Sequence, residues 1–139
     1  MKKTINLLLV LVLVLGLLGG CSPKTEVGSQ GEGDTIKVGL NYELSGNVAT
    51  YGQSLTAGIE LAMEEINNNG GVLGKQIEII KIDNKSDSAE AANVSTRLIT
   101  RDNVVAILGP ATSGNTKGAI PPAMQHKVPL ISASATDDD

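Results

Sequence analysis

Beyond residue 34, four short apolar segments of the chain have the pattern of β-strands. Residues 36–42 alternate between apolar and polar positions, and residues 76–83 place isoleucine at positions 77, 79, 80 and 82. Residues 104–109 form a continuous apolar run, which is typical of a parallel strand buried on both faces. Residues 128–132 make the fourth predicted strand, with a proline near its start, where a sheet tolerates it.

The first segment between these strands has the periodicity of an amphipathic helix. The helix is predicted from residue 51 or 52 to Asn67, and the run Asn68–Gly71 ends it. One face of this helix collects the apolar residues Leu55, Ile59, Ala62, Met63 and Ile66. That face is expected to pack on the sheet.

Two further helices are predicted between the later strands. The sequence Asp87–Glu90 has the form of a capping box and opens a helix that ends near Arg101. The predicted inner face of this helix is Ala89, Ala92, Leu98 and Ile99. The last helix runs toward His126, and two adjacent prolines at 121 and 122 are expected to disturb it.

Strands and helices therefore alternate in the order β-α-β-α-β-α-β. This alternation predicts an α/β fold with a doubly wound parallel sheet, joined by right-handed crossovers and covered by helices on both faces. The loops that follow the four strands, at 43–50, 83–86, 109–116 and 132–139, must then gather at the carboxyl edge of the sheet. Open α/β sheets bind their ligands at that edge.

Two of these loops contain stretches that are rich in hydroxyl groups and poor in charge. They read Ala-Thr-Ser-Gly-Asn-Thr at 111–116 and Ser-Ala-Ser-Ala-Thr at 132–136. Hydroxyls and free backbone N–H groups at a helix start suit a carboxylate, and carbonyl oxygens beside them suit an ammonium group. The composition therefore indicates a site for a small zwitterion. The same residues are also explained as helix caps and turn hydroxyls, and composition alone leaves both interpretations open.

The first 21 residues have the order of a secretory signal. Two lysines precede an apolar run at 7–18, and small residues then lead to Cys21, the single cysteine of the chain. The apolar run is too short for a comfortable membrane-spanning helix, which needs about 20 residues. The Leu-Gly-Gly-Cys sequence resembles a bacterial lipobox, which implies cleavage of a signal peptide at 1–20 and lipidation of Cys21. Residues 21–34 are expected to form a flexible, glycine-rich tether.

Charge and composition exclude several kinds of partner and bond. The chain has 11 basic and 15 acidic side chains, and loss of residues 1–20 removes two lysines, which leaves a net charge of −6. This acidic balance argues against nucleic acid as a partner. A single cysteine permits no intrachain disulfide, and with two tyrosines as its aromatic residues the core must be aliphatic. The length suits one small domain at most, and we expect the chain to be a fragment of a longer protein.

A series of short sequence motifs carries a more specific resemblance. These motifs are Leu44-Ser-Gly46, Tyr51-Gly52, Ala62-Met-Glu-Glu-Ile-Asn67, Gly70-Gly-Val-Leu-Gly-Lys75, Gly109-Pro110 and Val128-Pro-Leu-Ile-Ser132. In their order and spacing, residues 35–136 resemble the branched-chain amino acid binding proteins of ABC transporters. The resemblance implies a two-lobed type I periplasmic binding fold, with residues 35–139 as part of the first lobe. It also implies a lipid-anchored extracytoplasmic protein that captures leucine, isoleucine, valine or a similar amino acid for a membrane permease.

The resemblance implies roles for seven residues in holding the ligand. Ser113 would offer its hydroxyl and N–H to the ligand carboxylate. Thr136 would bind the carboxylate and amino end, and the carbonyl of Ser134 would accept from the ammonium group. The remaining implied contacts come from Ala111, Thr112, Tyr51 and Ser45. Glu43 stands where relatives often have a small residue, and the resemblance assigns it no role.

Other patterns suggest chemistry that the sequence does not complete. Residues 70–76 superficially resemble a phosphate loop, but the spacing is one residue short and the segment precedes a strand. No dinucleotide fingerprint follows the first strand, so no cofactor is expected. We interpret His126 as a surface residue at a helix end, and Asp83 and Asp87 as a turn and a cap, with no metal. Two alternatives to transport stay open: a sensory receptor ectodomain of the same fold, and an anchored enzyme.

Overall fold

The structure, a computed structural model, describes residues 35–138. The predicted signal peptide, Cys21 and the tether lie outside the described residues. The described elements are β1 (Thr35–Tyr42), α2 (Ala49–Asn68), β2 (Gln76–Asp83), α3 (Ser88–Thr100), β3 (Ala106–Leu108), α4 (Ser113–His126) and β4 (Leu130–Ile131). None of the helices in residues 35–138 is both long enough and apolar enough to cross a bilayer.

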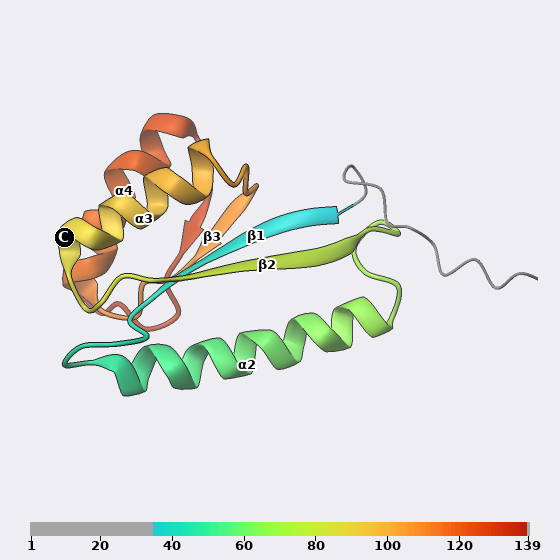
Figure 1. The fold of residues 1–139 in the computed structure, drawn as a ribbon, viewed down its shortest axis with the longest axis horizontal. Coiled ribbons are helices and arrows are strands. Elements are labelled where there is room, and N and C mark those ends of the chain that lie inside the picture. Colours follow the sequence, from blue (N-terminus) through green and yellow to red (C-terminus); the bar gives the residue numbers. More distant parts are fainter. Residues whose placement is uncertain (1–34, 139) are drawn as a thin grey trace, which may run out of the picture. The chain divides into compact units, whose positions relative to one another are not determined.

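All four strands are parallel and lie in the order β2-β1-β3-β4 (Figure 1). Strand β1 pairs with β2 along its whole length, from Thr35 opposite Gln76 to Tyr42 opposite Asp83. The predicted β-α-β-α-β-α-β order and parallel sheet are therefore confirmed. Because the chain passes from β1 to β2 and then to β3 on the other side of β1, its winding direction reverses between β1 and β3. Doubly wound folds bind ligands at such a switch point, beyond the carboxyl ends of the strands.

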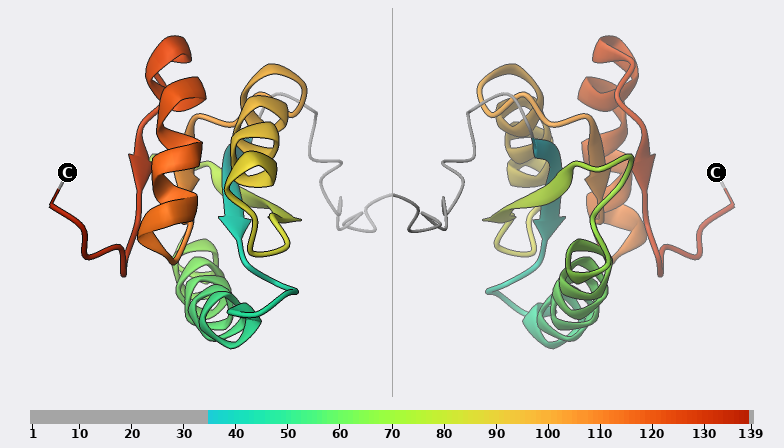
Figure 2. Two further views of the ribbon diagram at one scale, coloured as in Figure 1. Left: turned by 90° about the vertical axis from the view of Figure 1, so that its left-hand side faces the viewer. Right: turned by 90° about the vertical axis from the view of Figure 1, so that its right-hand side faces the viewer.

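The helices cover the two faces of the sheet unequally. Helix α2 lies alone on one face, and α3 and α4 lie side by side on the other (Figures 1 and 2). The core beneath α3 and α4 is built from Val94, Leu98, Val104 and Ile107. The core beneath α2 is built from Leu40, Tyr42 and Ala111, with Leu55 and Ile59 packed against them. Apart from Tyr42, both clusters are aliphatic, as the composition predicts.

The inner face of α3 differs from the predicted one. The buried residues of this helix are Ala91, Val94, Ser95 and Leu98, whereas Ala89 is exposed. Leu98 and the core contact of Ile99 confirm part of the prediction, which was wrong at Ala89 because it ranked positions by apolar character alone. Asn41 of β1 is fully buried beneath the helix, and its amide donates to the Ala91 carbonyl at 2.8 Å and to the Ser95 hydroxyl at 2.9 Å. Since a buried amide must be hydrogen-bonded, the helix turns Ser95 toward the sheet.

The bounds of other elements also depart from the predicted ones. Strand β3 begins two residues later than expected, and Val105 is 56% exposed, so the apolar run at 104–109 is not buried throughout. Helix α2 begins at Ala49, and of its predicted apolar face Ala62 and Ile66 are exposed.

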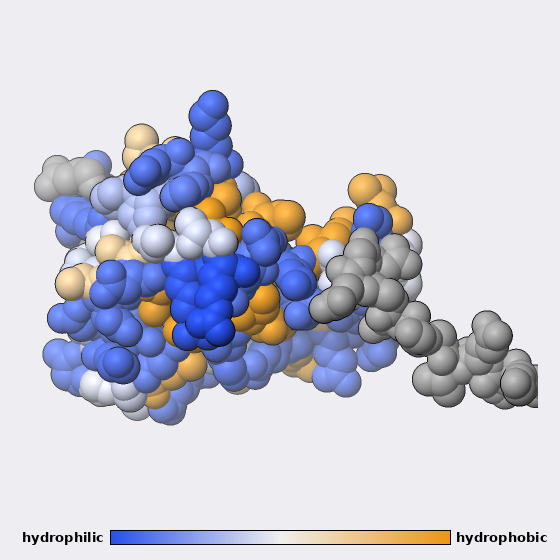
Figure 3. All heavy atoms as spheres, turned by 45° about the horizontal axis from the view of Figure 1, so that its top comes forward, coloured by the Kyte–Doolittle hydropathy of each residue, from blue (hydrophilic) through white to orange (hydrophobic). Residues whose placement is uncertain are grey.

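The face of the molecule that carries α3 and α4 shows hydrophilic side chains with apolar patches between them (Figure 3).

Helix α4 continues without a break through Pro121 and Pro122. Each proline lacks the N–H that would bond four residues back, so a disturbance is predicted there. Ala119 and Ala123, on either side of the prolines, are buried, and their packing stabilises the helix across the prolines. The exposed His126 ends the helix, as predicted.

The glycine-rich segment after α2 is a turn, as predicted. Val72 and Lys75 pair with each other across it, and Gly70, Gly71 and Gly74 have positive φ angles. The segment leads into β2 at the amino edge of the sheet, opposite the edge where ligands bind.

Candidate functional site

A pocket of about 240 Å³ lies at the carboxyl edge of the sheet. Its lining is Tyr51, Ala111, Thr112, Ser113, Ser134 and Thr136. These are six of the seven residues predicted to hold a ligand, and they come from three separate segments. Tyr51 stands in the first turn of α2, residues 111–113 join β3 to α4, and residues 134 and 136 follow β4. The parallel sheet brings them together because the carboxyl ends of all its strands meet at this edge.

Ser113 is the first residue of α4 and ties this helix to the segment after β4. Its hydroxyl oxygen accepts the N–H of Thr136 at 3.0 Å and the N–H of Asp137 at 3.3 Å. Both bonds use the oxygen as acceptor, so the hydroxyl proton remains available as a donor. The first turn of α4 holds no acidic residue, and the N-cap side chain, Thr112, makes no capping bond. The N–H groups of this turn are therefore left for other acceptors.

Serine hydroxyls after β4 hold the loop that follows β3. The Ser132 hydroxyl donates to the Pro110 carbonyl at 2.6 Å, and the Ser134 hydroxyl donates to the Ala111 carbonyl at 2.6 Å. These bonds fix the two hydroxyl-rich loops against each other. The hydroxyl groups thus serve as turn contacts, which was one of the two interpretations of the composition, while they also shape the wall of a pocket.

Glu43, at the end of β1, is fully buried behind this wall. Its carboxylate accepts four hydrogen bonds, from the N–H of Ala111 at 3.0 Å, the N–H and hydroxyl of Thr112 at 3.1 and 2.8 Å, and the amide of Asn115 at 2.8 Å. Burial alone raises the pKa of Glu43, but the hydrogen bonds from Ala111, Asn115 and Thr112 outweigh it, so the pKa lies below the usual value. Glu43 is therefore an ionised clamp on the loop between β3 and α4.

The position of the Glu43 backbone requires a glycine on the neighbouring helix. Gly52, in the first turn of α2, is buried against the Glu43 backbone, and a Cβ at position 52 would lie 2.1 Å from the Glu43 carbonyl oxygen. No other residue type allows so close an approach without movement of the helix or the strand. In the sequence pair Tyr51-Gly52, Tyr51 therefore lines the pocket, and Gly52 packs against Glu43, which holds the pocket wall.

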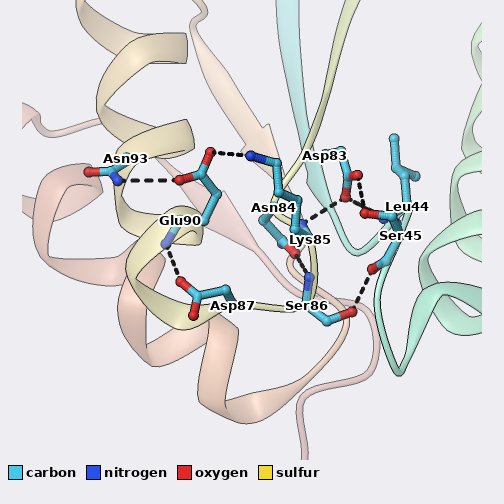
Figure 4. Close-up of polar contacts among 9 residues, drawn as sticks. All are labelled: Leu44, Ser45, Asp83, Asn84, Lys85, Ser86, Asp87, Glu90 and Asn93. Carbon is cyan, nitrogen blue, oxygen red and sulfur yellow. Dashed lines mark hydrogen bonds and ion pairs between the residues drawn. The ribbon is translucent and has the colours of Figure 1, made fainter.

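Ser45 lies apart from the other six predicted residues and is absent from the pocket lining. Its hydroxyl donates to Asp83 at 2.5 Å and its N–H donates to the same carboxylate at 3.1 Å (Figure 4). Asp83 also accepts the N–H groups of Leu44 and Lys85. Burial alone raises the pKa of Asp83, but the Ser45 hydroxyl and these N–H groups outweigh it and lower the pKa below the usual value. Ser45 therefore belongs to a turn that joins the ends of β1 and β2.

A buried network of amides continues from this turn into α3. The Asn84 side chain donates to Asn41 at 3.0 Å. It also accepts the N–H of Ser86 at 3.1 Å (Figure 4). Asp87 caps α3 by accepting the N–H of Glu90 at 2.7 Å, whereas the Glu90 carboxylate pairs with Lys85 and does not complete the capping box. Asp83 and Asp87 are thus a turn and a cap, as predicted. Within residues 35–138, no group of three His, Cys, Asp or Glu residues could hold a metal ion.

The pocket continues into a second hollow of about 370 Å³. This hollow shares Tyr51 and Ser134 with the first and adds Thr50, Ser54 and Leu55 from α2. The first pocket offers hydroxyls and N–H groups, and the second adds the apolar side chain of Leu55. Together they can receive a small molecule with a polar end and an apolar end.

These residues lie in a segment that matches a known protein family. The family model described as periplasmic binding protein matches residues 35–139, which is more than half of the chain. The chain belongs to the periplasmic binding protein family. This membership confirms the family predicted from the sequence motifs, and periplasmic binding proteins of ABC importers are extracytoplasmic.

Relatives of this periplasmic binding protein include the Leu/Ile/Val-binding protein homolog 7 of Brucella suis. It is 33% identical over 131 residues, which make up 94% of this chain and 31% of the relative. The solved structure of the branched-chain amino acid transporter substrate binding protein LivJ from Streptococcus pneumoniae, in complex with isoleucine, is 54% identical with a TM-score of 0.74. That likeness covers 75% of this chain and 30% of LivJ.

A third relative is the solute binding protein of an ABC transporter from Rhodopseudomonas palustris, solved in complex with 3,4-dihydroxybenzoic acid. It is 32% identical with a TM-score of 0.68, over 73% of this chain and 28% of that one. The periplasmic binding protein described here therefore spans about a third of the length of its relatives. The comparisons confirm the α/β fold class with a parallel sheet, corresponding to part of the first lobe of the type I fold.

Sequence reasoning missed the role of Glu43 in this site. Its partners are 68 to 72 residues away in the chain, so no local pattern links them. The available signal was the position of an acidic residue directly after a strand that ends at the ligand-binding edge.

Proposed function

We propose that this periplasmic binding protein is the solute-binding lipoprotein of an ABC importer and captures branched-chain or similar amino acids. The observation that supports the proposal is the pocket at the start of α4, which hydroxyl-bearing side chains line without any charged side chain and which lies beside a helix N-terminus without a side-chain cap. A zwitterion needs both donors and acceptors, and such a site provides them without burying unpaired charged side chains.

The ligand carboxylate would bind at the start of α4. The Ser113 hydroxyl proton and N–H are its donors, and Thr136 closes the site from the segment after β4. The ammonium group would lie toward the carbonyl of Ser134. Thr112 and Ala111 form the wall, and Tyr51 separates this polar end from the hollow beside Leu55, which suits an aliphatic side chain.

The comparisons support this assignment of ligand class. A relative named for Leu/Ile/Val binding aligns with 94% of this chain, and a structure holding isoleucine aligns with 75% of it. Because the chain spans about a third of those proteins, the rest of the binding cleft would come from a second lobe, and the ligand would be trapped when the lobes close.

The cellular setting follows from the same proposal. Acylated Cys21 would anchor the protein in the membrane, and the tether at 21–34 would let the globule reach a permease in the same membrane. The protein would be extracytoplasmic, would bind and release its solute without catalysis, and would use no cofactor.

Calorimetric titration of the full-length protein with leucine, isoleucine and valine tests the proposal. At least one of them should bind, and Ser113→Ala should weaken binding by about 1–3 kcal/mol, because a buried ligand oxygen loses a partner. The matched control is Ser45→Ala, which removes a serine hydroxyl at the same edge that bonds to Asp83 and does not line the pocket. Equal losses in the two variants, or no binding of any of the three amino acids, would refute the proposal.

A further inference from the structure

Glu43 places an ionised carboxylate directly behind a pocket whose lining carries no charged side chain. It contacts this lining through the N–H of Ala111 and through the N–H and hydroxyl of Thr112. The side chain is fully buried, so water does not screen it. The hydrogen bonds keep its pKa below the usual value, and the carboxylate is therefore ionised at neutral pH.

This carboxylate changes the electrostatics of the start of α4. A helix N-terminus attracts anions through a partial charge of about +0.5 and through its free N–H groups. Here the carboxylate of Glu43 already occupies the N–H groups of Ala111 and Thr112. Its full negative charge is larger than the partial positive charge of the helix start, so it opposes the attraction of the helix for an anion. The donors at Ser113 can still bond to one ligand oxygen, but the site no longer favours an anion by charge.

We infer that Glu43 is a charge-selecting residue that makes the pocket prefer a zwitterion over a carboxylate anion of the same shape. A zwitterion brings an ammonium group, which the Glu43 charge stabilises, whereas a simple carboxylate brings only repulsion. The inference rests on the proposed binding of amino acids. Proteins similar to this chain hold ligands of both kinds: one structure holds isoleucine, and another holds 3,4-dihydroxybenzoic acid, a carboxylic acid without an amino group.

A purely structural role for Glu43 has a different consequence. If Glu43 only held the loop between β3 and α4 in place, its loss would weaken the binding of every ligand that uses this loop. A charge-selecting role changes the ratio of two affinities, because the Glu43 charge acts on the ammonium group that the zwitterion alone carries, while its effect on the carboxylate is common to both ligands. The ratio is therefore the quantity to measure.

The test compares leucine with 4-methylpentanoate, which is leucine without its amino group, by calorimetry on the full-length protein at pH 7. Wild-type protein should bind leucine more tightly. Glu43→Gln, which keeps the shape and removes the charge, should lower the leucine-to-4-methylpentanoate preference by roughly tenfold, as expected for loss of one unit charge several ångströms from the ligand. An unchanged preference in Glu43→Gln, with both affinities reduced equally, would overturn the inference.

Asp83→Asn is the matched control. Asp83 also accepts four hydrogen bonds and has a lowered pKa, but it ends β2, on the side of β1 away from β3 and β4, and lines no part of the pocket. Its replacement should leave the preference as in wild type, and a tenfold change there would contradict a local effect of Glu43. Should Glu43→Gln fail to fold, Glu43→Asp retains the charge and should retain the preference. Loss of the preference in Glu43→Asp would count against charge selection.

The outcomes separate this inference from the proposed function. Wild-type protein that binds neither 4-methylpentanoate nor any of leucine, isoleucine and valine would refute both the inference and the proposed function. Wild-type protein that binds the two equally would overturn charge selection while the proposed binding of amino acids stands.

Discussion

Alanine at position 52 should destabilise the protein, whereas alanine at position 58 of the same helix should stabilise it. Both residues are glycines of α2 with ordinary helical backbone. A Cβ at position 52 would lie 2.1 Å from the Glu43 carbonyl oxygen, 2.7 Å from its carbonyl carbon and 2.9 Å from its nitrogen. At position 58 no heavy atom lies within 4 Å of the added carbon. The two substitutions therefore share their chemistry and differ only in the surrounding space.

The expected magnitudes follow from two opposing effects. Alanine in place of glycine favours a helix by about 0.5–1 kcal/mol, and this is the whole effect at Gly58. At Gly52 the atoms that clash are backbone, so α2 or the end of β1 must shift by on the order of 1 Å to restore an ordinary contact. Overpacking of this kind costs about 1–3 kcal/mol, which exceeds the helix gain over most of that range and leaves Gly52→Ala destabilised by up to about 2.5 kcal/mol.

Urea unfolding of the full-length variants measures the two changes, and calorimetry reports the effect on the pocket. Gly52→Ala should also weaken ligand binding, because a shift of Glu43 moves the loop at 111–112 that it clamps. Gly58→Ala should leave binding unchanged. A stabilised Gly52→Ala variant with normal ligand affinity would refute the reasoning, since it would mean that Glu43 does not depend on the close approach of α2.

Three further outcomes follow from hydrogen-bonded and apolar side chains of the fold. Glu43 and Asp83 have lowered pKa values in the folded protein, so they contribute stability above the pKa values of the unfolded chain. That stability should be lost as the pH falls through their folded pKa values, and melting temperatures between pH 6 and pH 3 should fall less steeply in Glu43→Gln than in wild type. Asn41→Ala should cost about 2–4 kcal/mol in urea unfolding, because it breaks three buried hydrogen bonds and leaves the Asn84 amide unpaired; a loss below about 1 kcal/mol would contradict this. Leu98→Ala should cost about 2–5 kcal/mol by the same assay, since Leu98 is fully buried over β1, and a change near zero would mean that α3 repacks.

Sequence periodicity was most accurate where apolar character alone decides burial. The limits of β2 agree with those predicted from its isoleucine-rich segment, and the end of α2 agrees with the glycines that follow it. Periodicity was wrong on α3, where a buried amide from a distant strand required a serine on the inner face. Hydrophobic patterns carry no information about such a partner, because Asn41 and Ser95 are 54 residues apart.

The sequence by itself determined the order of strands and helices, and with it the edge at which the hydroxyl-rich loops meet. This was possible because the geometry of parallel crossovers is local and general, so strand ends of one kind must share one edge. The tertiary structure alone decided which of the candidate residues share a pocket, by separating Ser45 from the others and by placing Glu43 behind Ala111 and Thr112. A buried carboxylate is tolerated only where several donors converge on it, and those donors are brought together by the folded sheet.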